Sequence, residues 1–264
     1  MSDYGHYSFI RVDPREGVAL CTLNRPDALN SVTREGHHEL EDLFVQLAED
    51  GAINAVVLTG AGRAFCAGGD VKGMDPDMYD SPAGIFDSGA RKLLAALLAI
   101  EKPVIAAVNG DAVGLGATIA LACDIIYMAE GARIGDPHVK VGLVPGDGGA
   151  VLWPLLVGPA RAKEYLMTGD LLPATEAERI GLVNHVRPAE SVLDDAMALA
   201  ARLAGGATLA IRFAKLSVQR TILQSVLNSL DLSLALEALT GKSKDYEEAI
   251  SAFAAKRRPT FQGR

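Results

Sequence analysis

The chain has few aromatic residues and few cysteines. Phe, Trp and Tyr make up 5% of its 264 residues, so aliphatic side chains must build most of the core. Its three cysteines, Cys21, Cys66 and Cys123, are widely spaced in apolar or glycine-rich surroundings. This pattern argues against a disulfide framework or a zinc site and is typical of reduced, buried thiols. The sequence therefore predicts a cytoplasmic protein.

Positive charge is also scarce. The chain has 33 Asp and Glu against 25 Lys and Arg, and the one basic cluster is Lys256, Arg257 and Arg258. This balance argues against nucleic acid as a partner. The sequence shows no apolar run of membrane-spanning length, and its N-terminal residues do not have the form of a signal peptide. We therefore expect no membrane partner.

The chain is rich in aliphatic residues, alanine and glycine, and the most informative stretch lies at 104–118. Residues 104–108 are apolar and β-branched and predict a buried strand. Gly114, Leu115 and Gly116 then begin a helix of small residues. Glycines at such a junction let the backbone approach a ligand and leave the first N–H groups of the helix free. This pattern favours an anion or oxyanion site, with a tight turn needed only for packing as the alternative.

A second glycine-rich loop follows another predicted strand, at 55–59. It runs through A-F-C-A-G-G-D at 64–70. Two such loops in neighbouring units each offer a backbone N–H to a single carbonyl oxygen. An oxyanion stabilised in this way lowers a barrier by roughly 3–4 kcal/mol per donor.

The remaining pattern predicts a mixed α/β chain that ends in helices. We expect a hairpin from 7–12 and 18–23, a helix capped by Thr33, a mobile loop at 71–83 and a helix at 85–100. One strand at 183–187 interrupts the C-terminal helices, which are expected at 160–167, 175–180, 191–203, 208–220, 226–239 and 244–255. Such a long helical tail is typical of an oligomerisation element.

Eight motifs in order resemble the enoyl-CoA hydratase/isomerase family, the crotonase superfamily, over essentially the whole chain. They are L-N-R-P-D-A-L-N (23–30), A-F-C-A-G-G-D (64–70), A-A-V-N-G (106–110), G-L-G-A (114–117), C-D-I-I (123–126), G-L-V-P-G-D-G-G (142–149), G-L-V-N (181–184) and F-A-A-K-R-R-P-T-F (253–261). The resemblance implies an α/β spiral of ββα repeats over 1–200. It also implies a helical region at 201–264 that builds a homotrimer or a hexamer, the latter a dimer of trimers.

The resemblance also implies an acyl-CoA thioester as substrate, its carbonyl held between the backbone N–H groups of Ala67 and Leu115. Coenzyme A then arrives as part of the substrate, with no permanently bound cofactor and no metal. The positions that match substrate- and CoA-binding residues of the family are Arg25, Ala28, Ala64, Gly68, Asp70, Gly114, Lys256 and Phe261.

Two departures from the family pattern bear on the chemistry. Thr118 and His138 stand where hydratases of the family carry their two glutamates. A threonine hydroxyl orients water but does not act as a base at neutral pH, whereas an imidazole does. Asp147 follows His138 by nine residues, which resembles the β-diketone hydrolase branch, where a His/Asp pair activates water. For Asp147 the alternative is an N-cap of the next helix; for His138 it is a loop histidine in a diverged copy.

Three hypotheses follow. The first is a hydratase/isomerase-type enzyme that stabilises a thioester enolate and uses His138, supported by Asp147, to move a proton. The second is a hydrolase that cleaves a C–C bond of a β-dicarbonyl compound. The third is a non-catalytic relative that binds coenzyme A, because both glutamates are missing.

Overall fold

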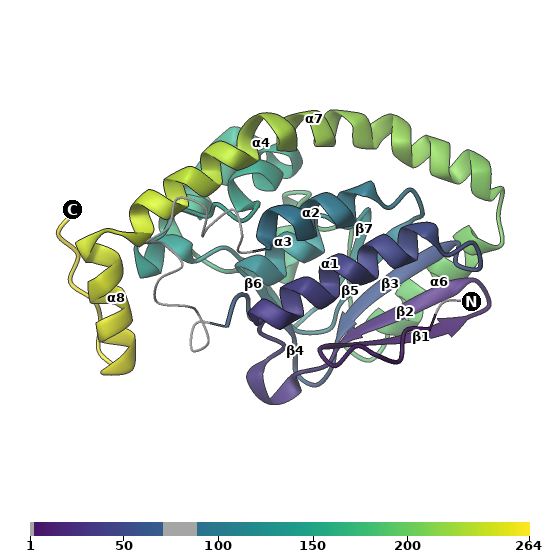
Figure 1. The fold of residues 1–264 in the computed structure, drawn as a ribbon, viewed down its shortest axis with the longest axis horizontal. Coiled ribbons are helices and arrows are strands. Elements are labelled where there is room, and N and C mark those ends of the chain that lie inside the picture. Colours follow the sequence, from purple (N-terminus) through teal and green to yellow (C-terminus); the bar gives the residue numbers. More distant parts are fainter. Residues whose placement is uncertain (1–2, 71–88) are drawn as a thin grey trace.

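The structure is a computed structural model that describes residues 3–70 and 89–264. Its N-terminal part is a layered α/β core, and the long C-terminal helix α7 (Thr208–Gly241) runs across one side of it (Figure 1). The predicted loop at 71–83 and the first residues of the helix predicted at 85–100 lie outside the described residues.

Six strands form the larger sheet, in the order β1-β2-β3-β5-β7-β10. Strands β1 (Ile10–Arg15) and β2 (Val18–Leu23) form the predicted antiparallel hairpin. The first strand lies at 10–15 and not at the predicted 7–12, because residues 13–15 pair with β2 and the turn is confined to Glu16 and Gly17. Strand β2 then pairs in parallel with β3 (Ala55–Gly60). The parallel set continues through β5 (Val104–Val108), β7 (Ile125–Ala129) and β10 (His185–Arg187). Every residue of β2, β3 and β5 is buried, as expected for strands covered on both faces.

A smaller sheet has the order β4-β6-β8-β9. Its strands are β4 (Ala64–Cys66), β6 (Asp111–Val113), β8 (Arg133–Gly135) and β9 (Leu172–Pro173). The chain places β3, β5 and β7 in the large sheet and follows each with β4, β6 or β8 in the small one. This alternation is the predicted spiral of ββα repeats, and it aligns the strand ends that carry the glycine loops.

Helices cover the sheets. Helix α1 (Arg34–Glu49) begins as predicted, because the Thr33 side chain accepts a hydrogen bond from the Gly36 N–H at 3.1 Å. Helices α2 (Ala90–Ala99) and α3 (Leu115–Leu121) follow, and α4 (Gly149–Thr168) is kinked at Gly158. Short α5 (Ala174–Arg179) precedes α6 (Val192–Ala204), which packs on β2, β3, β5 and β7.

The two helices predicted at 208–220 and 226–239 are one continuous helix, α7. The prediction of a break was wrong because 221–225 contains neither glycine nor proline, and the Ser225 hydroxyl donates to the Thr221 carbonyl within the helix. Contrary to the expectation that no run reaches membrane-spanning length, α7 is long and apolar enough to cross a membrane, and 28% of its most apolar window is buried. Because α7 packs on α2, α4 and α6, one face of it belongs to the fold. Helix α8 (Lys244–Ala254) ends the chain's regular structure.

Candidate active site

The first glycine loop leads from β6 into α3 as predicted. Gly114 has a φ of 55°, a value that favours glycine, and its N–H donates to the Gly135 carbonyl at 2.9 Å. Leu115 is the first residue of α3, so its N–H has no partner inside the helix. It donates to no other acceptor within the described part of the chain. The N–H of Leu115 is therefore available to a ligand.

The second glycine loop differs from the prediction. The N–H of Ala67 donates to the Leu29 carbonyl at 3.0 Å, so it is not available to a substrate oxygen. This bond contradicts the assignment of Ala67 as a donor. Gly69 lies in a parallel bridge with Val32, where Val32 N–H donates to the Gly68 carbonyl and Asp70 N–H donates to the Val32 carbonyl. The Gly69 N–H points away from that bridge and meets no acceptor among the described residues.

The two loops touch each other. A Cβ atom at Gly68, where φ is +95°, would lie 2.9 Å from the Val113 carbonyl oxygen and 3.6 Å from the Leu115 nitrogen. A Cβ atom at Gly116 would lie 2.2 Å from the Cys66 carbonyl oxygen. Only glycine fits at these contacts, and they bring the backbone beside Gly69 next to the free N–H of Leu115.

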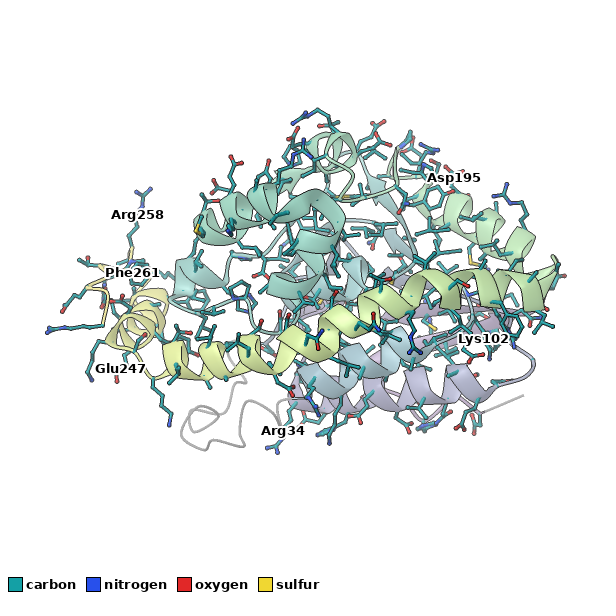
Figure 2. The ribbon with its side chains drawn as sticks, turned by 90° about the horizontal axis from the view of Figure 1, so that it is seen from above. Arg34, Lys102, Asp195, Glu247, Arg258 and Phe261 are labelled. Carbon is teal, nitrogen blue, oxygen red and sulfur yellow. The ribbon has the colours of Figure 1, made fainter. Side chains whose placement is uncertain are left out.

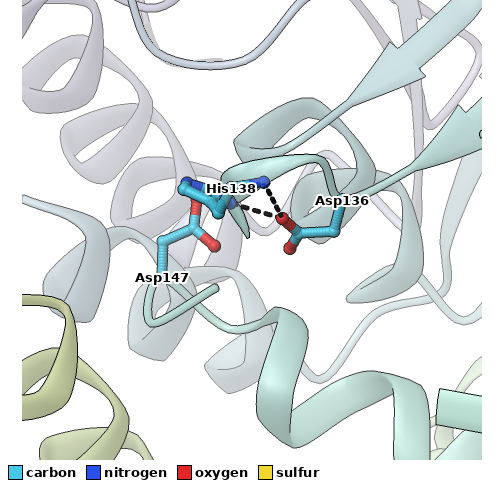
Figure 3. Close-up of side chains that lie close together, drawn as sticks. All are labelled: Asp136, His138 and Asp147. Atoms are coloured by element: carbon cyan, nitrogen blue, oxygen red, sulfur yellow. Dashed lines mark hydrogen bonds and ion pairs between the residues drawn. The ribbon is translucent and has the colours of Figure 1, made fainter. Parts of the chain in front are cut away.

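His138 begins the 3-10 turn η3 (His138–Val141), which follows β8. Its ring nitrogen Nδ1 is hydrogen-bonded to Asp136 Oδ1, and its backbone N–H donates to the same oxygen at 3.4 Å (Figure 3). A Cβ atom at Gly114 would lie 3.5 Å from His138 Cε1. The imidazole therefore lies beside the first glycine loop, and its side chain is 17% exposed.

Asp147 faces the other side of this ring. Its Oδ2 atom is 3.9 Å from His138 Nε2, and its Oδ1 accepts a hydrogen bond from the Thr118 hydroxyl at 3.2 Å. The three predicted residues Thr118, His138 and Asp147 thus come together from α3, η3 and the loop before α4. The alternative for Asp147 was an N-cap of α4. The N-cap residue of α4 is Gly148, but the Asp147 carboxylate also accepts a hydrogen bond from the backbone of Gly149, at the start of the helix.

The charges of these groups are set by burial and by one another. Burial alone would lower the pKa of His138, but the carboxylates of Asp136 and Asp147 outweigh it and raise that pKa well above its usual range. Burial raises the pKa of Asp147 to about 6, although the charge of His138 opposes this shift. These shifts favour the imidazolium form of His138 and, above about pH 6, the carboxylate form of Asp147.

Asp136 is a functional residue that the sequence analysis missed. Its side chain is 1% exposed, and it rather than Asp147 holds Nδ1 of the imidazole. The signal was an acidic residue two positions before the histidine, in D-P-H. Ligand atoms of Asp136, His138 and Asp147 all lie within 4.8 Å of one another, close enough to hold a metal ion. Because Nδ1 is already bound by a carboxylate, we interpret the three as an acid/base group.

The predicted CoA-binding residues fall into two regions. Arg25 Nη2 and Asp70 Oδ2 form an ion pair at 2.9 Å beside the second glycine loop, and Ala28 lies in the 3-10 turn η1 (Pro26–Ala28). Ala64 is buried in β4. Lys256 and Phe261 are both exposed in the tail after α8. Figure 2 shows Phe261 at the end of the molecule where the chain terminates.

The tail itself is held in place. The Thr260 N–H donates to Glu248 at 2.9 Å, and Asp245 accepts from the N–H groups of Gln262 and Gly263. Within one chain, the tail therefore lies along α8.

Comparison with known proteins decides the family. A model of the enoyl-CoA hydratase/isomerase family matches residues 13–264. The chain belongs to the enoyl-CoA hydratase/isomerase family. It is 38% identical over 263 residues to the 1,2-epoxyphenylacetyl-CoA isomerase of Escherichia coli K12. The match covers 97% of this chain and 99% of that relative.

Two further relatives of this family agree. The crotonyl-CoA hydratase of Syntrophomonas wolfei is 35% identical over 97% of this chain and 98% of its own length. The crystal structure of an enoyl-CoA hydratase/isomerase from Mycobacterium paratuberculosis superposes with a TM-score of 0.88 at 36% identity, covering 94% of this chain and 99% of that one. These matches confirm the predicted fold and family.

Proposed function

We propose that this protein is an acyl-CoA-processing enzyme of the enoyl-CoA hydratase/isomerase type, which stabilises a thioester enolate with two backbone N–H groups. The family supports the acyl-CoA class. The observation that carries the proposal is the pair of N–H groups at Leu115 and Gly69, on touching loops beside a charged imidazole and carboxylate. The second donor is therefore Gly69 in place of Ala67.

Proton transfer in this proposal uses the opposite charges of His138 and Asp147. The Asp147 carboxylate accepts a proton from the substrate or from water, and the His138 imidazolium donates one. The distance of 3.9 Å between His138 Nε2 and Asp147 Oδ2 is too long for a hydrogen bond, so both atoms are available to a substrate. Thr118 holds the second Asp147 oxygen. This assigns the base to Asp147, whereas the sequence suggested His138.

The substitutions at the family's glutamate positions bear on the class of reaction. Simple hydration uses two carboxylates around one water, and the resemblance of the motifs implies that Thr118 and His138 stand at those two positions here. One carboxylate that is not hydrogen-bonded to the imidazole, Asp147, beside the His138 imidazolium suits movement of a proton between two carbons. We therefore rank isomerisation above hydration.

Turnover of thioesters tests the proposal. The protein, His138→Gln and Asp147→Asn are incubated with crotonyl-CoA and with branched, cyclic and dienoyl thioesters, and products are separated by chromatography. We expect conversion of at least one thioester and a loss of about 10²-fold or more in each variant. An inert protein that also shows no binding of coenzyme A in calorimetry contradicts the proposal. Turnover that depends on His138 excludes a purely binding role.

A second candidate is hydrolysis of a C–C bond in a β-dicarbonyl compound. The arrangement Asp136–His138–Asp147 favours it, because a carboxylate-held imidazole beside a second carboxylate suits activation of water. Ring opening of a cyclic 1,3-diketone that stops in His138→Ala supports this candidate. Thioester turnover without any action on diketones counts against it.

We also propose that the chain assembles as a trimer or a hexamer in the cytoplasm. In such an assembly the exposed tail with Lys256 and Phe261 reaches the CoA channel of a neighbouring subunit, near the equivalents of Arg25 and Ala28. The exposed apolar side chains of α7 and the fixed conformation of the tail support this arrangement.

A further inference from the structure

Helix α7 brings a buried carboxylate to the acid/base group from the C-terminal region. Glu237 is 6% exposed, and it belongs to none of the motifs found in the sequence. The backbone of Gly146, which immediately precedes Asp147, lies against it. A Cβ atom at Gly146 would be 2.5 Å from Glu237 Oε2 and 2.7 Å from Glu237 Cβ. The side chain of Glu237 thus occupies the space that a larger residue at 146 would need.

The same face of α7 holds the loop at two further points. The Val144 N–H donates to the Thr240 hydroxyl at 3.1 Å, and the Ser233 carbonyl oxygen lies 2.6 Å from the Cβ position of Gly146. Residues 233, 237 and 240 have the spacing of one helix face. The segment 144–146 therefore rests on α7, with Glu237 at the middle of the contact.

Resting on the proposed function, we propose that Glu237 is a positioning residue of the active site: it fixes the loop that carries Asp147 and adds a third negative charge around His138. Among the described residues, three carboxylates raise the pKa of His138: Asp136 at Nδ1, Asp147 3.9 Å from Nε2, and Glu237 from α7, which has the smallest effect of the three. The pKa of Tyr246, on α8, is raised mainly by burial and to a lesser extent by the nearby charge of Glu237. A carboxylate favours the imidazolium form of a nearby histidine.

Titration of His138 by nuclear magnetic resonance tests the proposal without any substrate. Imidazole signals are followed against pH in the wild-type protein and in Glu237→Gln, and His138 is assigned by its loss in His138→Gln. We expect the midpoint of His138 to fall by roughly half a pH unit or more in Glu237→Gln. The control is Asp231→Asn, which removes one negative charge from an exposed site on the same helix, where Asp231 is paired with Arg91. We expect the midpoint of His138 in this control to stay at the wild-type value.

An unchanged midpoint in Glu237→Gln, or an equal shift in Asp231→Asn, overturns the proposal. If Glu237→Gln does not fold, Glu237→Asp is the second test, because it keeps the charge but withdraws it from Gly146. We then expect kcat to fall about fivefold or more with KM little changed, and a wild-type kcat overturns the proposal. A wild-type protein that converts no thioester refutes the proposed function, while the titration still reports on Glu237.

Discussion

At the scale of single residues, the choice between Ala67 and Gly69 as oxyanion donor rests on one backbone hydrogen bond. Gly69→Pro removes the N–H, whereas Gly69→Ala keeps it and adds a Cβ atom that meets nothing within 4 Å. We expect kcat to fall about 10²–10³-fold in Gly69→Pro and to stay near wild type in Gly69→Ala. Steady-state kinetics with a thioester that the wild type converts measures both. Equal loss in the two variants contradicts a role for this N–H.

The charge of Asp147 predicts a pH dependence. Burial raises its pKa to about 6, so the carboxylate is protonated below that pH and ionised above it. If Asp147 is the base, kcat/KM falls as the pH drops through about 6, because the carboxylate becomes protonated. If His138 is the acid, kcat/KM falls again at high pH as the imidazolium loses its proton, and the raised pKa of His138 moves this second fall above the usual range of a histidine. A pH–rate profile from pH 4.5 to 10 is the measurement. An acid limb near pH 4, the ordinary range of a carboxyl, would speak against this assignment.

Some residues of the candidate site could be predicted from the sequence, and others could not. His138, Asp147 and Thr118 could be predicted to meet because each lies at a defined place in a family motif. Asp136 and Gly69 could not, because their roles depend on side-chain direction and on which N–H a neighbouring carbonyl occupies. Asp136 is only two positions from His138, but the sequence does not give the direction of its side chain. The hydrogen bond that occupies the Ala67 N–H joins segments far apart in the chain, and no local pattern reports it.

At the scale of elements, close contact between α3 and β4 holds the two glycine loops together. Gly116→Ala places a Cβ atom 2.2 Å from the Cys66 carbonyl oxygen, whereas Gly131→Ala, the control, meets nothing within 4 Å. We expect Gly116→Ala to lower the free energy of unfolding by about 1–3 kcal/mol, because backbone on both sides must shift. Urea unfolding followed by circular dichroism compares the two. Equal stability of both variants contradicts this account.

Elements were predicted well where local signals mark their ends, and less well where they do not. The hairpin, the Thr33 cap and the strands of the large sheet follow from turn residues and buried runs. The helices predicted at 208–220 and 226–239 are one helix, because no glycine or proline between them ends the first. The pairing of short β4, β6 and β8 into a second sheet followed only from the family resemblance.

At the scale of the whole molecule, α7 leaves much apolar surface uncovered. Its exposed large apolar residues are Leu209, Phe213, Val218, Leu227, Leu232, Leu236 and Leu239, and Leu227 is 75% exposed. An exposed apolar surface of this extent is typical of a contact with another protein. Because the other face of α7 already packs on the core, we expect copies of this chain to cover the outer one.

Leu227→Asp tests this expectation by placing a charge in the covered surface. We expect the wild-type protein to sediment as a trimer or a hexamer and Leu227→Asp to sediment as a smaller species, because burying an unpaired carboxylate at the interface costs several kcal/mol. Asn228→Asp adds the same charge at the adjacent, exposed position and serves as control. A monomeric wild type, or identical sedimentation of all three proteins, would show that this face of α7 is not the interface. Because α7 also carries Glu237, a smaller species with reduced kcat would link assembly to the acid/base group through this one helix.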